Sequence, residues 1–223
     1  IDNFLKDKNS FVFESVEKGI IKGRYTIFGK DPDKIWEFND KRSYIINKEN
    51  KKKLIKGDPK KIIENLIENF KFKTPKQLPP ICSLISGFFS YDSIRYMEKI
   101  PNSCKNDLKL PDVRLLRPRI LVIHDNLKKK IFFIVNVFKD EKISNYKNRF
   151  NEINKEILFL IKQSNTKNSP KKSLVTKKIK VKSNTTKKKF LSMVKKAKEY
   201  IKIGDVFQVV ISQRFEAKLT KDP

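Results

Sequence analysis

The sequence predicts an α+β fold with mixed, largely antiparallel sheets and flanking helices. Strand-like runs come first, within the opening fifty residues, and strand and helix patterns are mixed after them. Neighbouring strand runs are joined by short turns, which is typical of antiparallel hairpins rather than of a doubly wound α/β protein. Hydrophobic residues make up 38% of the 223 residues, 17 Phe among them, so a sizeable core can form.

The opening fifty residues predict a β-meander. A loop containing Gly19 and Gly23 separates the first two strands, and Asn39-Asp40 is a good hairpin turn between the last two. The lysines at 51–53 are expected to end the meander. The four expected strands are residues 10–15, 24–29, 34–38 and 42–47.

A helix is expected next, because Asp58 and Pro59 suit the N-cap and the first helical position. Residues 77–80 then break the chain before a second apolar segment at 81–91. The apolar face of the helix would consist of Ile62, Ile63, Leu66, Ile67 and Phe70.

A second hairpin is predicted in the middle of the chain, with strands at 120–123 and 131–135 and a turn at 124–130. Both strands are nearly continuous in apolar residues, so both of their faces are expected to be buried. Ser144 can cap the helix that follows. The apolar stripe of that helix consists of Tyr146, Phe150, Ile153, Ile157, Leu160 and Ile161.

A domain boundary is expected in residues 164–184, because their richness in Lys, Ser, Thr and Asn is typical of a surface linker. Residues 1–163 would form one domain, and residues 185–223 would begin another. A helix capped by Thr185 or Thr186 and ended by Gly204 opens this second part. Residues 206–215 alternate as a strand.

The chain is strongly basic, with 52 Lys+Arg against 25 Asp+Glu and a formal net charge of +27. Such a charge favours nucleic acid or an anionic membrane as a partner. The lysines are scattered, however, and the arginines, which bind phosphate and guanine in a bidentate manner, form no cluster. We therefore expect neither a nucleic-acid nor a membrane partner. No apolar run approaches the ~20 residues that span a bilayer.

No self-contained catalytic or metal site is visible. Cys82 and Cys104 form no C-x-x-C pair, and the single histidine, His124, cannot complete a zinc site with them. Both thiols are expected to be reduced, in a cytoplasmic protein, and His124 is expected in a solvated turn. Neither G-x-G-x-x-G nor a P-loop motif occurs. The paired carboxylates are expected to be loop and helix-surface charges: Asp31, Asp33, Glu64 and Glu68.

Four segments, in order, resemble the large subunit of anthranilate synthase, a family of chorismate-utilising enzymes. They are FVFESVE at 11–17 with GRYTIFG at 23–29, GFFSYDSIRYME at 87–98, LPD at 110–112 continuing to IHD at 123–125, and AKEYI at 197–201 with GDVFQVVISQRF at 204–215. Together they cover most of the chain. The chain begins at Ile1 rather than Met and stops at Pro223, so both ends are expected to be truncations.

The resemblance implies conversion of chorismate to anthranilate in tryptophan biosynthesis, with Mg²⁺ bound and ammonia supplied by a glutamine amidotransferase partner. Residues 1–163 would be the amino-terminal domain, 164–184 a linker, and 185–223 the start of the chorismate-binding catalytic domain. The magnesium-binding glutamates, the catalytic histidine and most chorismate contacts would lie beyond Pro223. The chain alone is therefore expected to hold no metal or catalytic residue and to be inactive.

The resemblance also implies that Glu14 and Ser15 line a tryptophan feedback pocket. An amino acid ligand needs a carboxylate for its ammonium group and donors for its carboxylate, held on a rigid strand. The alternative is that Glu14 and Ser15 merely end an edge strand. Phe13 stands where the family usually has Leu, and this difference in volume could alter the shape of the pocket.

Gln208 is the other residue to which the resemblance gives a role, as part of the active-site wall. Related enzymes that add water to chorismate carry a lysine general base here, and an amide cannot deprotonate water. Gln208 therefore fits the ammonia-using members, although a strand glutamine can also simply bond its neighbours. Arg95 and Tyr96 are expected to cap and pack rather than to bind a ligand.

Three alternatives remain open at this point. Aminodeoxychorismate synthase component I, an enzyme of the folate pathway, also carries Gln at the position of Gln208. A basic nucleic-acid-binding module is supported only by charge, and it predicts a contiguous basic face with exposed aromatic residues. A stand-alone regulatory module that binds tryptophan would have only half of its pocket.

Overall fold

The structure is a computed structural model of the chain, and it describes residues 8–14, 23–40, 42–70, 72–103, 106–141, 143–165 and 180–218. The chain divides into two compact units, Ile1–Lys167 and Asn168–Pro223, and each is described by itself. The predicted α+β architecture is confirmed. Within the described ranges, no helix has the length and apolar character needed to cross a membrane.

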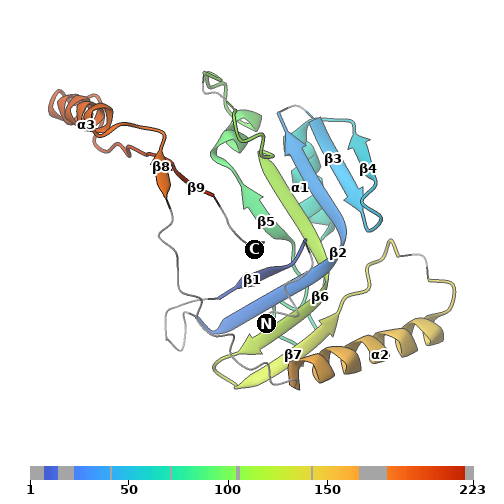
Figure 1. Cartoon of the computed structure of the whole chain (residues 1–223). Helices are drawn as coiled ribbons and strands as arrows, with labels where there is room; N and C mark the ends of the chain where they lie inside the picture. The colour runs from blue at the N-terminus through green and yellow to red at the C-terminus, as the bar shows by residue number, and fades with distance from the viewer. Residues whose placement is uncertain are drawn as a thin grey trace. The chain divides into compact units, whose positions relative to one another are not determined.

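The first unit is built on a curled antiparallel sheet (Figure 1). Two long strands, β2 (Tyr25–Asn39) and β6 (Val113–Asp125), pair along almost their whole length and form its centre. At one end the strand order is β4-β3-β2-β6-β5, and at the other β1 pairs with β2 and β7 pairs with β6. The shorter strands are β1 (Phe11–Phe13), β3 (Arg42–Asn47), β4 (Lys52–Ile55), β5 (Ser86–Phe89) and β7 (Lys130–Val135).

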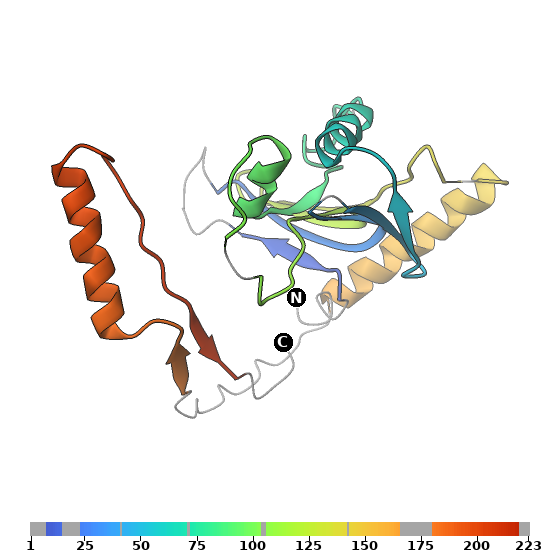
Figure 2. The ribbon, with the colours of Figure 1, turned by 90° about the horizontal axis from the view of Figure 1, so that it is seen from above.

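The two ends of the sheet meet at a bend in β2, where the sequence predicted two separate strands at 24–29 and 34–38. The register shifts between Pro32 and Lys34, and Pro32 lies opposite Pro118 of β6. Asp31, with a φ of 52°, precedes the shift. Proline donates no backbone hydrogen bond and is tolerated in a sheet at such a bulge, so β2 continues through it. Figure 2 shows the resulting curl.

Two hydrophobic clusters fill the two halves of this unit. Helix α1 (Pro59–Asn69) covers the first cluster, which consists of Trp36, Phe38, Val113 and Leu115. The N-cap is Asp58, as predicted, and its side chain accepts a hydrogen bond of 3.2 Å from Lys61 N. The second cluster lies at the other end of the sheet and consists of Cys82, Leu121, Ile123 and Ile134.

The predicted end of the meander at the lysines 51–53 is wrong, because β4 forms there and pairs with β3. Lysines are common on edge strands, where their side chains reach solvent.

The second hairpin is present, but its first strand, β6, is much longer than residues 120–123. His124 is therefore not in a solvated turn. It pairs with Thr26 and Ile131 inside the sheet and is partly buried.

Helix α2 (Tyr146–Asn165) packs against β7, with Leu160 buried. Ser144 was the wrong cap: Asn145 Oδ1 accepts the hydrogen bond from the first turn, at 3.1 Å from Asn148 N. The amino-terminal end of the predicted apolar stripe, at Tyr146 and Phe150, stays exposed. A short 3₁₀ helix, η1 (Tyr91–Tyr96), follows β5.

The second unit contains a two-stranded ribbon of β8 (Val181–Ser183) and β9 (Phe215–Ala217) and the helix α3 (Lys187–Lys202). Thr186 caps α3, as one of the two predicted caps, and Gly204 follows its end with a φ of 82°. The predicted strand at 206–215 is wrong except for its last residue. Of residues 206–215 only Phe215 belongs to a strand, β9, which pairs with β8. An extended segment needs such a partner for its backbone groups to form a sheet.

Candidate functional site

The first predicted site lies at the open end of β1. Glu14 directly follows the last strand residue, Phe13, and is exposed, whereas Ser15 lies outside the described residues. The strand is held by antiparallel pairing with β2, in which Phe13 faces Ile27. A carboxylate exposed at the end of a paired strand is accessible to a cationic group of a ligand, as the sequence-based hypothesis requires.

An ion pair that sequence analysis did not single out joins the residue before β2 to the last residue of β6. Arg24 donates to both carboxylate oxygens of Asp125, at 3.1 and 2.8 Å. Asp125 is 1% exposed and also accepts hydrogen bonds from the backbone N–H groups of Leu127 and Lys128. The hydrogen bonds from Arg24 lower the pKa of Asp125 to about 2. This residue is therefore ionised in the folded chain and fixes the turn after β6.

The bend of the sheet carries a second set of ion pairs. Arg119 donates to Asp31, at 2.7 Å, and to Glu156 of α2, at 2.7 and 3.1 Å. Burial alone would lower the pKa of Arg119, but its hydrogen bonds to Glu156 and Asp31 outweigh it and raise that pKa. Arg117 pairs in the same way with Asp33 and Asp140.

The expectation that Asp31 and Asp33 are loop charges is therefore wrong. Both lie within β2 and bind arginines of β6 across the bend. Sequence analysis missed this because a proline argues against a central strand, and Pro32 and Pro118 lie in the middle of the two strands that carry these charges. Glu64 and Glu68 are exposed on α1, as predicted.

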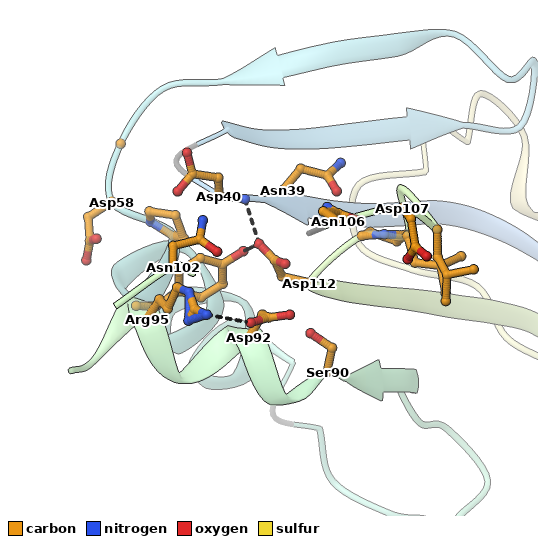
Figure 3. Close-up of a pocket in the computed structure, with 16 residues that line it drawn as sticks. Asn39, Asp40, Asp58, Ser90, Asp92, Arg95, Asn102, Asn106, Asp107 and Asp112 are labelled. Atoms are coloured by element: carbon orange, nitrogen blue, oxygen red, sulfur yellow. Dashed lines mark hydrogen bonds and ion pairs between the residues drawn. The ribbon is translucent and has the colours of Figure 1, made fainter. Parts of the chain in front are cut away.

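A cavity of about 690 Å³ lies at the end of the sheet remote from β1 (Figure 3). It lies between the β2–β3 turn, the start of α1, the helix η1 and the loop before β6. Most of the residues that line it are polar, and Tyr96, two leucines and two prolines contribute apolar surface. The acidic and basic residues of the lining are Asp40, Asp58, Asp92, Arg95, Asp107 and Asp112.

Asp112 organises this cavity. Its Oδ2 accepts hydrogen bonds from the Tyr96 hydroxyl, at 2.9 Å, and from the backbone N–H of Asp40, at 2.6 Å. Its own backbone N–H donates to Phe38, and its carbonyl accepts from the N–H of Ser90. Burial, and then the hydrogen bond to Asp112, raise the pKa of Tyr96. Asp112 thus joins the turn and the helix through its side chain and the strand β2 through its backbone.

The charged groups of the cavity are largely engaged by the fold. Asp58 caps α1, and Asp92 pairs with Arg95 at 3.0 Å. Arg95 thus pairs with Asp92, and Tyr96 donates to Asp112, whereas among the described residues neither is seen in the predicted capping role. No set of three or more His, Cys, Asp or Glu side chains in the described ranges is placed to hold a metal ion.

Gln208 lies in the second unit, between α3 and β9, and is exposed. The segment around it carries exposed apolar side chains, among them Phe207 at 96% and Val210 at 82%. The structure thus brings Gln208 together with no second predicted site residue in the described part of its unit.

The chain is similar to known proteins over almost its whole length. A family model described as chorismate binding enzyme matches residues 23–223. Anthranilate synthase component 1 of Acetivibrio thermocellus is 32% identical over 217 residues, which are 96% of this chain and 44% of that protein. Anthranilate synthase alpha subunit 1, chloroplastic, of Oryza sativa subsp. indica is 32% identical over 240 residues, covering 98% of this chain and 41% of that protein.

The fold has a close counterpart among solved structures. The crystal structure of anthranilate synthase component I from Streptococcus pneumoniae TIGR4 matches with a TM-score of 0.71 and 24% identity. The match covers 98% of this chain and 46% of that chain. The chain therefore spans less than half of the length of the relatives that it matches.

Proposed function

The chain belongs to the family of chorismate binding enzymes, and from this premise we propose that it is part of the large subunit of an anthranilate synthase. That enzyme converts chorismate and ammonia to anthranilate and pyruvate in tryptophan biosynthesis. The observation that carries the proposal is the 32% identity to an anthranilate synthase component 1 over 96% of the chain. Residues 1–163 would be the amino-terminal domain, 164–184 a linker, and 185–223 the start of the catalytic domain.

The proposal includes partners that the reaction requires. Ammonia would come from a glutamine amidotransferase subunit, in the cytoplasm, and Mg²⁺ would assist at the chorismate site. The described residues offer no cluster of metal ligands, so we assign Mg²⁺ no ligand here. Gln208 would line the active site, where an amide suits a reaction whose nucleophile is ammonia and needs no general base for water.

Catalysis is tested by assaying the complete gene product with chorismate, Mg²⁺ and an ammonium salt. We expect fluorescent anthranilate, and none from residues 1–223 alone. Formation of aminodeoxychorismate instead would place the protein in the folate pathway and contradict the proposal. Anthranilate formation by residues 1–223 alone would show that catalytic groups lie within this chain after all.

The second part of the proposal is that Glu14, with Ser15, binds tryptophan as a feedback inhibitor. Glu14 is exposed at the end of β1, and its carboxylate would accept hydrogen bonds from the ammonium group of tryptophan. Charge-assisted bonds of this kind are roughly twice as strong as neutral ones. Glu14→Gln keeps the shape and removes the charge, so the inhibition constant for tryptophan should rise about tenfold.

The matched control is Glu64→Gln, which makes the same chemical change at an exposed position on α1. It should leave inhibition unchanged. Equal inhibition of the Glu14→Gln variant and the native enzyme would exclude Glu14 from the tryptophan site.

A further inference from the structure

Strand β1 is short and lies at the edge of the sheet, so its position depends on few contacts. It has three residues, and in the described part of the chain it pairs with β2 only (Figure 1). Glu14 directly follows its last residue. Whatever fixes β1 on the sheet therefore also fixes where the Glu14 carboxylate lies.

One cross-strand row of residues runs from β1 through β2 and β6 to β7. Phe11 of β1 faces Gly29 of β2, which faces Leu121 of β6, which faces Ile134 of β7. Leu121 and Ile134 belong to the second hydrophobic cluster, and Phe11 packs against that cluster. Gly29, which is buried, is the one member of the row without a side chain.

The ring of Phe11 occupies the space that a side chain at Gly29 would need. A Cβ atom built on Gly29 would lie 2.3 Å from both Cε1 and Cζ of Phe11, and 3.1 Å from Cδ1. Real Cβ atoms do not approach ring carbons this closely. The glycine is thus required for space: it lets the aromatic ring lie on the backbone of β2, an arrangement used elsewhere to stabilise glycines in sheets.

We propose that Phe11 and Gly29 form a seat that positions β1, and that Gly29 is therefore a positioning residue for the tryptophan site at Glu14. The inference rests on the proposed role of Glu14. A side chain at position 29 displaces the Phe11 ring, and β1 then loses its contact with the cluster. The inhibitor site should change while the chemistry of chorismate does not.

The size of the effect follows from which atoms clash. The clashing atoms are at the far end of the Phe11 side chain, which can rotate away, so the sheet itself need not move. The ring would then lose its core contacts, and β1 would still be held by its pairing with β2 and by the hydrogen bond of 2.9 Å from Arg114 to Asn9. We therefore expect a small loss of global stability and a larger loss of tryptophan affinity.

The test uses the complete gene product and three variants: Gly29→Ala, Phe11→Leu and the double variant. Tryptophan binding is measured by calorimetry, and kcat and KM for chorismate by anthranilate fluorescence. Gly29→Ala should raise the Kd for tryptophan about tenfold and leave kcat and KM within roughly twofold of the native values. Leucine is smaller than phenylalanine, so the double variant should bind tryptophan more tightly than Gly29→Ala does.

Ile134→Val is the matched control, because it weakens the same cluster at β7, which β6 separates from β2 and which does not touch β1 in the sheet. It should leave the tryptophan Kd unchanged. A Kd unchanged by Gly29→Ala, an equal rise for Ile134→Val, or a double variant no better than Gly29→Ala would each overturn the proposal. If Gly29→Ala does not fold, Phe11→Leu decides: it shrinks the group that packs on Gly29 and should raise the Kd for tryptophan, and a Kd equal to the native value would overturn the proposal.

Failure of this inference can be told apart from failure of the proposed tryptophan site. If Glu14→Gln weakens tryptophan binding and Gly29→Ala does not, the site stands and the seat does not position it. If Glu14→Gln leaves binding unchanged, the proposed site itself is wrong.

Discussion

Gly87 of β5 is the position at which a single methyl group should damage the sheet most. It lies opposite Leu115 of β6, which in turn faces Trp36 of β2. Its φ is +156°, and a Cβ atom at this position would lie 1.9 Å from the carbonyl oxygen of Arg114. The obstructing atom belongs to the backbone and cannot rotate away, so the Gly87→Ala change must push β5 from β6.

The expected cost has two parts. A backbone conformation that only glycine adopts readily costs about 1–3 kcal/mol with any other residue. Separation of β5 from β6 weakens the hydrogen bonds of their short ladder, each with a net value of about 1 kcal/mol. If about two of these hydrogen bonds are lost, the total is about 3–5 kcal/mol. This is a large part of the roughly 5–15 kcal/mol by which a typical domain is stable.

Urea unfolding followed by tryptophan fluorescence measures this loss. Trp36 is the single tryptophan of the chain, is 7% exposed and lies in the same cross-strand row as Gly87. The control is Gly57→Ala: its φ is +130°, but the nearest atom to its added methyl group is a side-chain carbon of Ile62 at 3.7 Å. This control reports backbone strain alone. If Gly87→Ala is as stable as Gly57→Ala, the close approach of β5 to β6 is wrong.

Two further predictions concern the ion pairs. The folded pKa of Asp125, about 2, lies below the ordinary value of ~3.9. Its pairing with Arg24 therefore stabilises the fold above pH ~4, and this stabilisation is lost as the pH falls towards 2. The urea midpoint should fall more steeply between pH 5 and pH 2 for the native chain than for Asp125→Asn, and parallel curves would contradict this. Arg119→Met should lower the free energy of unfolding by about 2–3 kcal/mol, which is less than for fully buried pairs because Asp31 and Glu156 are about one-third exposed. If this destabilisation vanishes in 1 M NaCl, the ion pairs of Arg119 are screened surface contacts and the reasoning is wrong.

Local signals in the sequence predicted the helix boundaries well. Asp58 before Pro59 and Thr186 before the lysines of α3 are caps whose chemistry depends on neighbours within one turn. The helix α2 shows the limit of the same reasoning. Ser144 and Asn145 are both competent caps, and the adjacent Asn145 is the one that the backbone geometry selects.

Strand predictions failed where pairing, and not the pattern of side chains, decides whether a strand forms. The run of lysines before Ile55 forms a strand because β3 offers it an edge, and Ile55 packs against the first cluster. Residues 206–213 have a better strand pattern, yet they belong to no strand. Alternation of side chains measures what a strand would bury, and pairing decides whether the strand exists.

The candidate tryptophan site shows a different limit. A glutamate after three apolar residues carries no chemical signature, so Glu14 was selected by resemblance to a family and not by its own pattern. The contact of Phe11 with Gly29 could not be predicted either. The two residues are eighteen positions apart, and the Phe11 ring fills the space that a side chain at Gly29 would need. A glycine in a strand pattern signals a close approach of some group, but the sequence does not say of which one.

The bend at Pro32 was the most informative failure, because the signal was present in the sequence. Asp31 and Asp33 flank one proline, and Arg117 and Arg119 flank the other. Antiparallel pairing of the two prolines sets Asp31 against Arg119 and Asp33 against Arg117. A slip of two residues would keep each side chain on its face of the sheet, but it would leave one carboxylate of β2 without its arginine and would take from one arginine of β6 one of its two carboxylate partners. Hydrophobic alternation cannot exclude such a slip, so here the charges must specify the register.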